Sequence, residues 1–167
     1  EASESAILDP SSAYSASKAS ADLLSLAQFK THKQNILISR CSNNYGPYQF
    51  PEKFIPVVIS KALKNNSIPV YGNGLNIRDW LHVEDHCDGI LTVIERGTIG
   101  EKYNIGGGEE LSNINLVKMI LKSCKKDENM IEYIKDRAGH DRRYAIDCSK
   151  IQNELGYIPV RPIYQSM

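Results

Sequence analysis

The chain has 167 residues, of which 41% are hydrophobic and 24% are charged, and this composition is typical of a folded globular domain. Twenty lysine and arginine residues balance twenty aspartate and glutamate residues, so the chain lacks the basic excess that nucleic-acid binding requires. No apolar run is long enough to span a bilayer. Composition therefore excludes a nucleic-acid-binding protein and a membrane-spanning one.

Apolar periodicity and turn residues predict alternating helices and strands. In chain order we expect a loop over 1–12, a helix over about 12–31, a strand over 36–41, a loop over 42–51, a helix over about 55–63, a strand over 69–71, a turn over 72–74, a strand over 77–83, a helix over about 84–96, a strand over 102–105, a helix over about 114–121, a strand over 130–134 and a helix over about 149–155. This alternation indicates an α/β fold.

The chain has four cysteines, Cys41, Cys87, Cys124 and Cys148, and no two of them form a Cys-x-x-Cys pair. Three of them lie in apolar-rich segments. We expect small buried thiols in a reducing compartment rather than disulfides. Because metal sites need clustered ligands, we expect no metal.

Tyr14 and Lys18 are four residues apart on the first predicted helix, so their side chains share one helix face. A lysine ammonium beside a phenol favours the phenolate, which makes such a pair a candidate acid–base device. Tyrosine and lysine at this spacing are also common on solvated helix surfaces. Small residues surround this pair, in the segment Ser11–Ala19, and would let a flat cofactor ring approach the helix.

Other polar residues have structural explanations as well as functional ones. Asn43 and Asn44 could occupy a turn with positive φ. Arg78 and Asp79 could form a surface ion pair of little energetic value. The Gly106–Gly108 run could cradle a phosphate, but a turn between a strand and a helix is the better explanation, because the run lacks the spacing of a dinucleotide-binding motif.

Five ordered segments resemble the dTDP-glucose 4,6-dehydratases, a family of extended short-chain dehydrogenases. The first contains Tyr14-Ser15-Ala16-Ser17-Lys18, and the others are 40–53, 70–80, 103–108 and 136–144. Five ordered blocks over roughly 130 residues are far more specific than one Tyr-x-x-x-Lys spacing. Within the last block, Ala138 stands where the family usually has proline.

The resemblance implies the C-terminal part of an extended short-chain dehydrogenase Rossmann-like fold with a small substrate-binding subdomain. Residues 1–48 would belong to the NAD-binding domain. Residues 49–167 would form mainly the nucleotide-sugar-binding subdomain, with some segments returning to the Rossmann domain. The cofactor would be NAD, the substrate dTDP-glucose, the location cytoplasmic and the full-length assembly a homodimer. In that family the helix that carries the tyrosine also packs in the dimer interface, where Leu24 could face the partner, although burial in the monomer would explain this leucine equally well.

The resemblance also assigns roles to residues. Tyr14 would take the proton of the sugar 4-hydroxyl while the hydride passes to NAD, Lys18 would assist Tyr14 and hold the nicotinamide ribose, and Asn44 would contact the nicotinamide. The nucleotide-sugar would be held by Asn43, Glu52, Lys53, Pro69, Val70, Tyr71, Arg78, Asn113, Arg137 and His140. Two arginines suit a diphosphate, and a tyrosine ring can stack on a pyrimidine.

Two features that the complete enzyme needs are not found in this sequence. One is a glycine-rich turn with an acidic residue about 20 residues later, which holds a dinucleotide. The other is an Asp-Glu pair before the tyrosine helix, which performs the elimination in the family. We therefore expect a chain that begins inside the enzyme and is inactive alone. An epimerase or decarboxylase of the same superfamily, or a non-catalytic binding module, are the alternatives.

Overall fold

The computed structural model describes residues 1–137 and 139–166. Ala138, the departure noted above, lies outside the described residues. The elements are α1 (Ala13–His32), β1 (Ile38–Cys41), β2 (Asn43–Tyr45), α2 (Phe54–Leu63), β3 (Ile68–Tyr71), β4 (Ile77–His82), α3 (Val83–Arg96), β5 (Lys102–Ile105), β6 (Glu110–Ser112), α4 (Asn113–Ser123), the short 3₁₀ helix η1 (Glu128–Met130), β7 (Ile131–Ile134), β8 (Arg143–Tyr144), α5 (Ser149–Leu155) and α6 (Ile163–Ser166). The predicted helices and strands are confirmed. The loop expected over 42–51 is interrupted by β2, and β6, β8 and α6 were not predicted.

The strands form three small sheets in which parallel pairing predominates. β1 pairs with β5, β2 with β4, and β3 with β7, all in parallel. β4 also pairs antiparallel with β6 and parallel with β8. This confirms the α/β architecture, because parallel neighbours require crossover connections, which here include helices.

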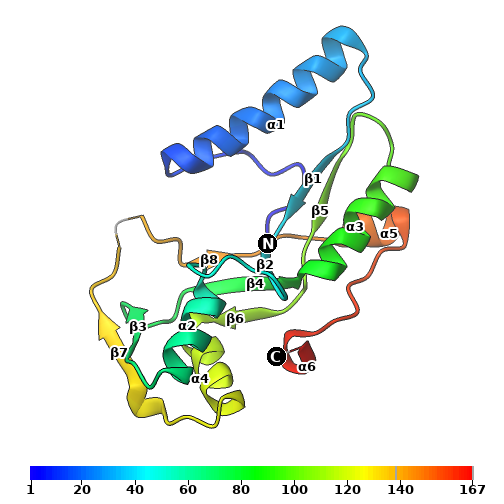
Figure 1. Ribbon diagram of the computed structural model, residues 1–167. Helices are drawn as coiled ribbons and strands as arrows, with labels where there is room; N and C mark the ends of the chain where they lie inside the picture. Colours follow the sequence, from blue (N-terminus) through cyan, green and yellow to red (C-terminus); the bar gives the residue numbers. More distant parts are fainter. Residues whose placement is uncertain (138, 167) are drawn as a thin grey trace.

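Two hydrophobic clusters divide the molecule into an upper and a lower body in the view of Figure 1. The upper cluster joins α3, β5 and α5, and includes Leu81, Tyr103 and Ile151. The lower cluster joins α2, β3 and α4, and includes Trp80 and Val117. Segments far along the chain thus pack beside β1. The domain division at residue 48 stays a prediction.

Strand β4 connects the two bodies. Its alternating side chains send Trp80 into the lower cluster and Leu81 into the upper one, and they are 5% and 0% exposed, respectively. Residues of the upper body and residues of the lower body are therefore held at a fixed spacing by strand β4.

Helix α1 lies apart from both bodies and none of its residues is buried (Figure 1). Leu23 and Leu24 are 59% and 67% exposed. The helix is tied to β1 by an ion pair in which Arg40 Nε donates to Asp22 Oδ2 at 2.6 Å. Burial of Leu24 in the core of this chain, one of its two sequence explanations, is therefore wrong.

The cysteine expectation is partly wrong. All four thiols are free, but Cys87 is exposed on α3, while the other three are partly buried. Cys87 faces solvent because the buried face of α3 is formed by Asp85, Gly89 and Val93. Within the described part of the chain, no helix has the length and apolar character needed to cross a membrane.

Candidate active site and nucleotide site

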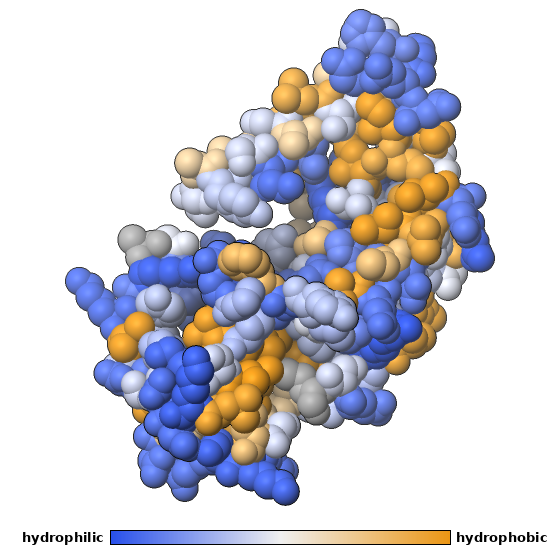
Figure 2. Space-filling model, viewed as in Figure 1, coloured by the Kyte–Doolittle hydropathy of each residue, from blue (hydrophilic) through white to orange (hydrophobic). Residues whose placement is uncertain are grey.

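The Tyr14–Lys18 pair occupies the first turns of α1. Ser12 caps this helix, because its hydroxyl accepts a hydrogen bond from the Ser15 N–H at 3.1 Å. Both side chains are exposed, and Tyr14 is 74% exposed. Figure 2 shows that the surface is hollowed between α1 and the elements below it. The pair is therefore accessible to a ligand in that hollow.

Cys41 on β1 and Tyr144 on β8 lie within electrostatic range of this pair. Burial raises the pKa of Cys41, whereas a hydrogen bond with the Asn44 side chain and the charge of Lys18 lower it. Burial also raises the pKa of Tyr144, and the neighbouring Cys41 and Tyr14 raise it further. The structure thus brings α1, β1 and β8 together around the candidate acid–base pair.

Asn43 and Asn44 are strand residues. Both belong to β2, and neither has the positive φ that a turn explanation required. Their register partners are Trp80 and Leu81. Because successive side chains leave a strand on opposite faces, Asn43 lies on the face of the lower core and Asn44 on the other. This separation fits the two roles predicted for them, one toward the nucleotide-sugar and one toward the cofactor.

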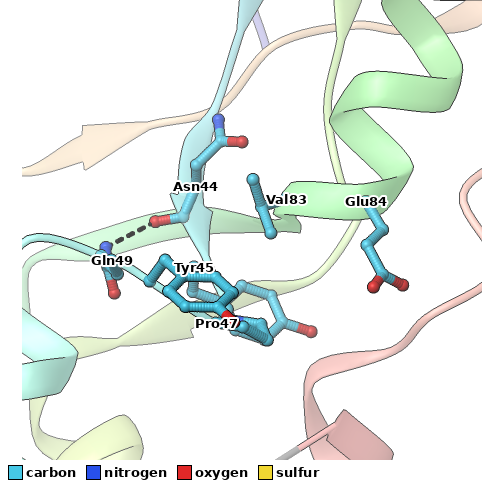
Figure 3. Close-up of a pocket in the computed structure, with 8 residues that line it drawn as sticks. Asn44, Tyr45, Pro47, Gln49, Val83 and Glu84 are labelled. Carbon is cyan, nitrogen blue, oxygen red and sulfur yellow. Dashed lines mark hydrogen bonds between the residues drawn. The ribbon is translucent and has the colours of Figure 1, made fainter.

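Asn44 lines a pocket of about 480 Å³ (Figure 3). The other lining residues are Tyr45, Gly46, Pro47, Tyr48, Gln49, Val83 and Glu84. The Gln49 side-chain amide donates to the Asn44 carbonyl at 2.8 Å, and the Asn44 side-chain amide donates to the Ser42 carbonyl at 3.1 Å. The bond from Gln49 holds the loop after β2 against the strand and so fixes one wall of the pocket.

A second group of predicted residues converges where β3 and β7 end. Tyr71 is the last residue of β3 and is 42% exposed. The Arg137 guanidinium lies 5.9 Å from the centre of its ring. The His140 ring meets the Tyr71 ring edge-on, with centroids 6.3 Å apart. Parallel strands end on the same side of a sheet, which explains how residues so distant in sequence meet.

Arg78 joins this group from β4. Burial lowers the pKa of Arg78, Asp141 opposes that shift, and the positive charge of Arg137 adds to it. Among the described residues, neither Arg78 nor Arg137 has a carboxylate within ion-pair distance. Arg78 donates instead to the Asp141 backbone carbonyl at 2.9 Å and to the backbone carbonyl of the preceding residue, Ile77, at 2.7 Å. Two neighbouring guanidinium groups without carboxylate partners are suited to an anion such as a diphosphate.

The ion pair considered for Arg78 and Asp79 is not formed. Asp79 is 2% exposed and accepts hydrogen bonds from the backbone N–H groups of Gly107 (3.2 Å) and Glu109 (3.0 Å). Its carboxylate occupies the place a phosphate would need beside the Gly106–Gly108 turn. That turn is structural, as predicted, although it leads into β6 and not directly into a helix.

Other predicted nucleotide-sugar residues are less involved. The Val70 side chain is 1% exposed in the lower core, so only its backbone can reach a ligand, and Pro69 is half-buried. Asn113 begins α4 and donates its N–H to the Asn76 carbonyl at 2.9 Å, next to the strand that carries Arg78. Glu52 and Lys53 are exposed before α2, and no described contact joins them to the arginine group.

Asp136 and Tyr144 were not selected from the sequence although both lie in the segment 136–144. Asp136 bonds His140 at 2.7 Å, and the His140 side chain is only 4% exposed. The spacing of four between an aspartate and a histidine was a signal for this pair. Tyr144 lacked one, because its approach to Tyr14 depends on the pairing of β8 with β4.

Comparison with known proteins places these observations in a family. A family model described as GDP-mannose 4,6 dehydratase matches residues 1–165. The chain is 52% identical over 152 residues to a dTDP-glucose 4,6-dehydratase from Actinoplanes sp., covering 91% of this chain and 48% of that protein. It is 50% identical over 161 residues to the Escherichia coli dTDP-glucose 4,6-dehydratase, covering 90% and 44%. The chain thus spans about half the length of these curated relatives.

Solved structures agree. The crystal structure of dTDP-glucose 4,6-dehydratase from Bacillus anthracis in complex with NAD has a TM-score of 0.94 and 49% identity, covering 98% of this chain and 52% of that one. The UDP-glucuronic acid 4-epimerase from Bacillus cereus, in complex with UDP-glucuronic acid and NAD, has a TM-score of 0.89 at 28% identity, covering 95% and 51%. The neighbours share the fold of extended short-chain dehydrogenases, as the sequence predicted.

Proposed function

Because the chain belongs to the GDP-mannose 4,6 dehydratase family, we propose that it is the C-terminal part of a dTDP-glucose 4,6-dehydratase. The complete enzyme would convert dTDP-glucose into dTDP-4-keto-6-deoxyglucose with bound NAD. Support comes from dTDP-glucose 4,6-dehydratases that are about half identical to this chain.

One observation carries the proposal: an acid–base pair and an anion site occur in one molecule. Tyr14 and Lys18 are exposed on α1, within electrostatic range of Tyr144 and Cys41, respectively. Arg78 and Arg137 are neighbours without an ion-paired carboxylate among the described residues, and Arg137 lies beside the Tyr71 ring. A nucleotide-sugar needs both, since its diphosphate requires guanidinium donors and its sugar hydroxyl requires a base.

NAD, when bound, would supply hydride chemistry at C4 of the sugar. Two observations support such a group: Asn44 lines the pocket of Figure 3, and Lys18 lies close enough to Cys41, three residues before Asn44, for its charge to lower the pKa of that thiol. Tyr14 would take the proton from the 4-hydroxyl, and the Lys18 ammonium would favour the phenolate that does so. The residues for elimination of water are expected outside this chain.

The test is turnover by the full-length gene product that carries this chain. Incubation with dTDP-glucose should give a 4-keto product lighter by one water, detected by mass spectrometry. Tyr14→Phe should abolish it, whereas Tyr164→Phe should not, since Tyr164 is an exposed tyrosine at the far end of the chain. Absence of the product with the active-site residues intact would contradict the proposal.

A sibling activity is the second candidate. The similarity to a UDP-glucuronic acid 4-epimerase favours it, and Tyr14 and Lys18 would serve oxidation at C4 in either enzyme. A product of unchanged mass with inverted C4 would identify an epimerase, and loss of carbon dioxide a decarboxylase. For the 167-residue chain alone, we expect weak NAD binding, since β1 and β5 form only a two-stranded sheet. Micromolar binding in calorimetry would contradict this expectation and favour a binding module.

We further propose that the full-length enzyme is a cytoplasmic homodimer. Support for the dimer comes from α1, whose Leu23 and Leu24 are exposed in this chain. Sedimentation of the full-length gene product tests it: a monomer at micromolar concentration would contradict the dimer.

A further inference from the structure

A single carboxylate oxygen organises the loop that carries two predicted nucleotide contacts. Asp136 Oδ1 accepts a hydrogen bond from the Arg137 backbone N–H at 2.9 Å and bonds the His140 ring nitrogen Nδ1 at 2.7 Å. Both partners were predicted to touch the substrate, whereas Asp136 was not. The oxygen therefore fixes the start and the end of a five-residue loop at once.

The turn after β3 leaves room for this carboxylate. Gly72 has a φ of +58°, and a Cβ atom at this position would stand 3.0 Å from Asp136 Oδ2. The Gly72 N–H also donates to the Ile134 carbonyl at 2.9 Å, which extends the pairing of β3 with β7. The approach of Asp136 to the Tyr71–Gly72 turn is thus built into the backbone.

The His140 ring supports the tyrosine instead of lying open to solvent. Its side chain is 4% exposed, and its ring meets Tyr71 at an interplanar angle of 83°. Arg137 lies over the same tyrosine ring. Asp136 bonds the His140 ring and the Arg137 backbone, and the side chains of these two residues both lie against the Tyr71 ring.

We propose that Asp136 is the positioning residue of the nucleotide site, holding Arg137 and His140 so that Tyr71 and the arginine pair can receive a pyrimidine nucleoside diphosphate. The ligand class rests on the proposed function. Asp136 acts through its neighbours and is not a catalytic residue.

Charge reinforces this arrangement. The groups facing the Asp136–His140 pair are Arg137 in the same loop and Tyr71 from β3, with Arg78 and Asp141 adjacent. The hydrogen bond with His140 holds the pKa of Asp136 below its usual range, and the Arg137 backbone and charge add to this effect. The Asp136 carboxylate is therefore ionised at neutral pH, and an ionised acceptor makes the stronger hydrogen bonds.

Two variants separate the anchoring from the charge. In Asp136→Asn, the amide oxygen can still accept both hydrogen bonds but carries no charge, whereas Asp136→Ala removes both. Binding of thymidine diphosphate to the full-length gene product would be measured by calorimetry. We expect Asp136→Ala to bind roughly five- to tenfold more weakly than Asp136→Asn, which keeps an acceptor oxygen for both hydrogen bonds.

Asp127 provides the matched control. It is an exposed aspartate that caps η1, at the opposite end of β7 from the nucleotide site, and its Oδ1 accepts the Asn129 N–H at 2.8 Å. Asp127→Ala should leave the affinity unchanged. Equal binding by the two Asp136 variants would overturn the proposal. Failure of the wild type to turn over dTDP-glucose would count only against the proposed function, since binding is measured separately.

Discussion

Replacement of Asp79 should lower the stability of the fold and leave ligand affinity nearly unchanged. Asp79 stands between Arg78 and Trp80 on β4, is 2% exposed, and uses both carboxylate oxygens: Oδ2 accepts from Gly107 and Oδ1 from Glu109. Asp79→Asn keeps the size of the side chain but has one acceptor oxygen. One buried backbone N–H then loses its partner and faces an amide N–H₂ group.

The loss of one hydrogen bond sets the expected decrease in the free energy of unfolding. An unpaired buried donor costs about 1–3 kcal/mol, and the donor-to-donor contact adds to it, so the free energy of unfolding should fall by roughly 2–4 kcal/mol. The assay is urea unfolding of the full-length gene product, followed by circular dichroism. The affinity for thymidine diphosphate in the folded state should change little, because the Asp79 carboxylate bonds the Gly107 and Glu109 backbone and makes no hydrogen bond or ion pair with either arginine.

Asp147 is the control for this prediction. It uses only Oδ1, which accepts from both the N–H and the hydroxyl of Ser149, so an asparagine can keep both bonds. Asp147→Asn should cost less than about 0.5 kcal/mol, since the asparagine side-chain oxygen can still accept both bonds and these bonds are exposed. If Asp79→Asn proved as mild as Asp147→Asn, the reasoning from two separate acceptor oxygens would be refuted.

Three further predictions concern the site. Arg78→Lys should raise the KM for dTDP-glucose about tenfold with kcat nearly unchanged, because a lysine cannot offer a bidentate donor pair to a diphosphate. Steady-state kinetics would measure both constants, and a fall in kcat alone would contradict this prediction. Tyr14→Phe should lower kcat by at least about 10²-fold without changing the melting temperature, since the ring is 74% exposed; a lower melting temperature would assign it a structural role. Burial raises the pKa of Cys148 to about 12, so at pH 8 iodoacetamide should modify the exposed Cys87 and leave Cys148 unreacted, as peptide mapping would show.

Sequence patterns predicted most of the helices and strands because these elements have strong local signals. Ser12 and Gly97 mark helix ends as expected, and apolar alternation located β3 and β4. The strands that were missed are short: β8 has two residues, and its exposed side chains give no hydrophobic pattern. β6 and β8 form strands because they pair with the edges of β4. That pairing depends on the tertiary fold and cannot be predicted from the local sequence.

The sequence predicted which residues belong to the candidate site, but it did not predict how they are arranged. Tyr71, Arg137 and His140 were selected, yet their sequence gives no sign that the His140 ring is covered or that Val70 faces the core. Their placement depends on the parallel pairing of β3 with β7, which brings residues 63 positions apart into register, as for Tyr71 and Ile134. Asp136 was missed because its importance lies in the bonds it makes, not in a ligand it touches.

The consecutive residues of β4 explain how the two halves of the site keep their spacing. Arg78 points to the nucleotide group, Trp80 anchors the lower core and Leu81 the upper core, all within one six-residue strand. A strand rises about 3.3 Å per residue and cannot stretch, so a shift of the lower body relative to the upper one would have to break the pairing of β4 with β2. The Asn43–Trp80 and Asn44–Leu81 register pairs therefore link the pocket beside Asn44 and the arginine pair as one unit. Helix α1, which carries the acid–base pair with no buried residue, is the element whose position this unit leaves least constrained.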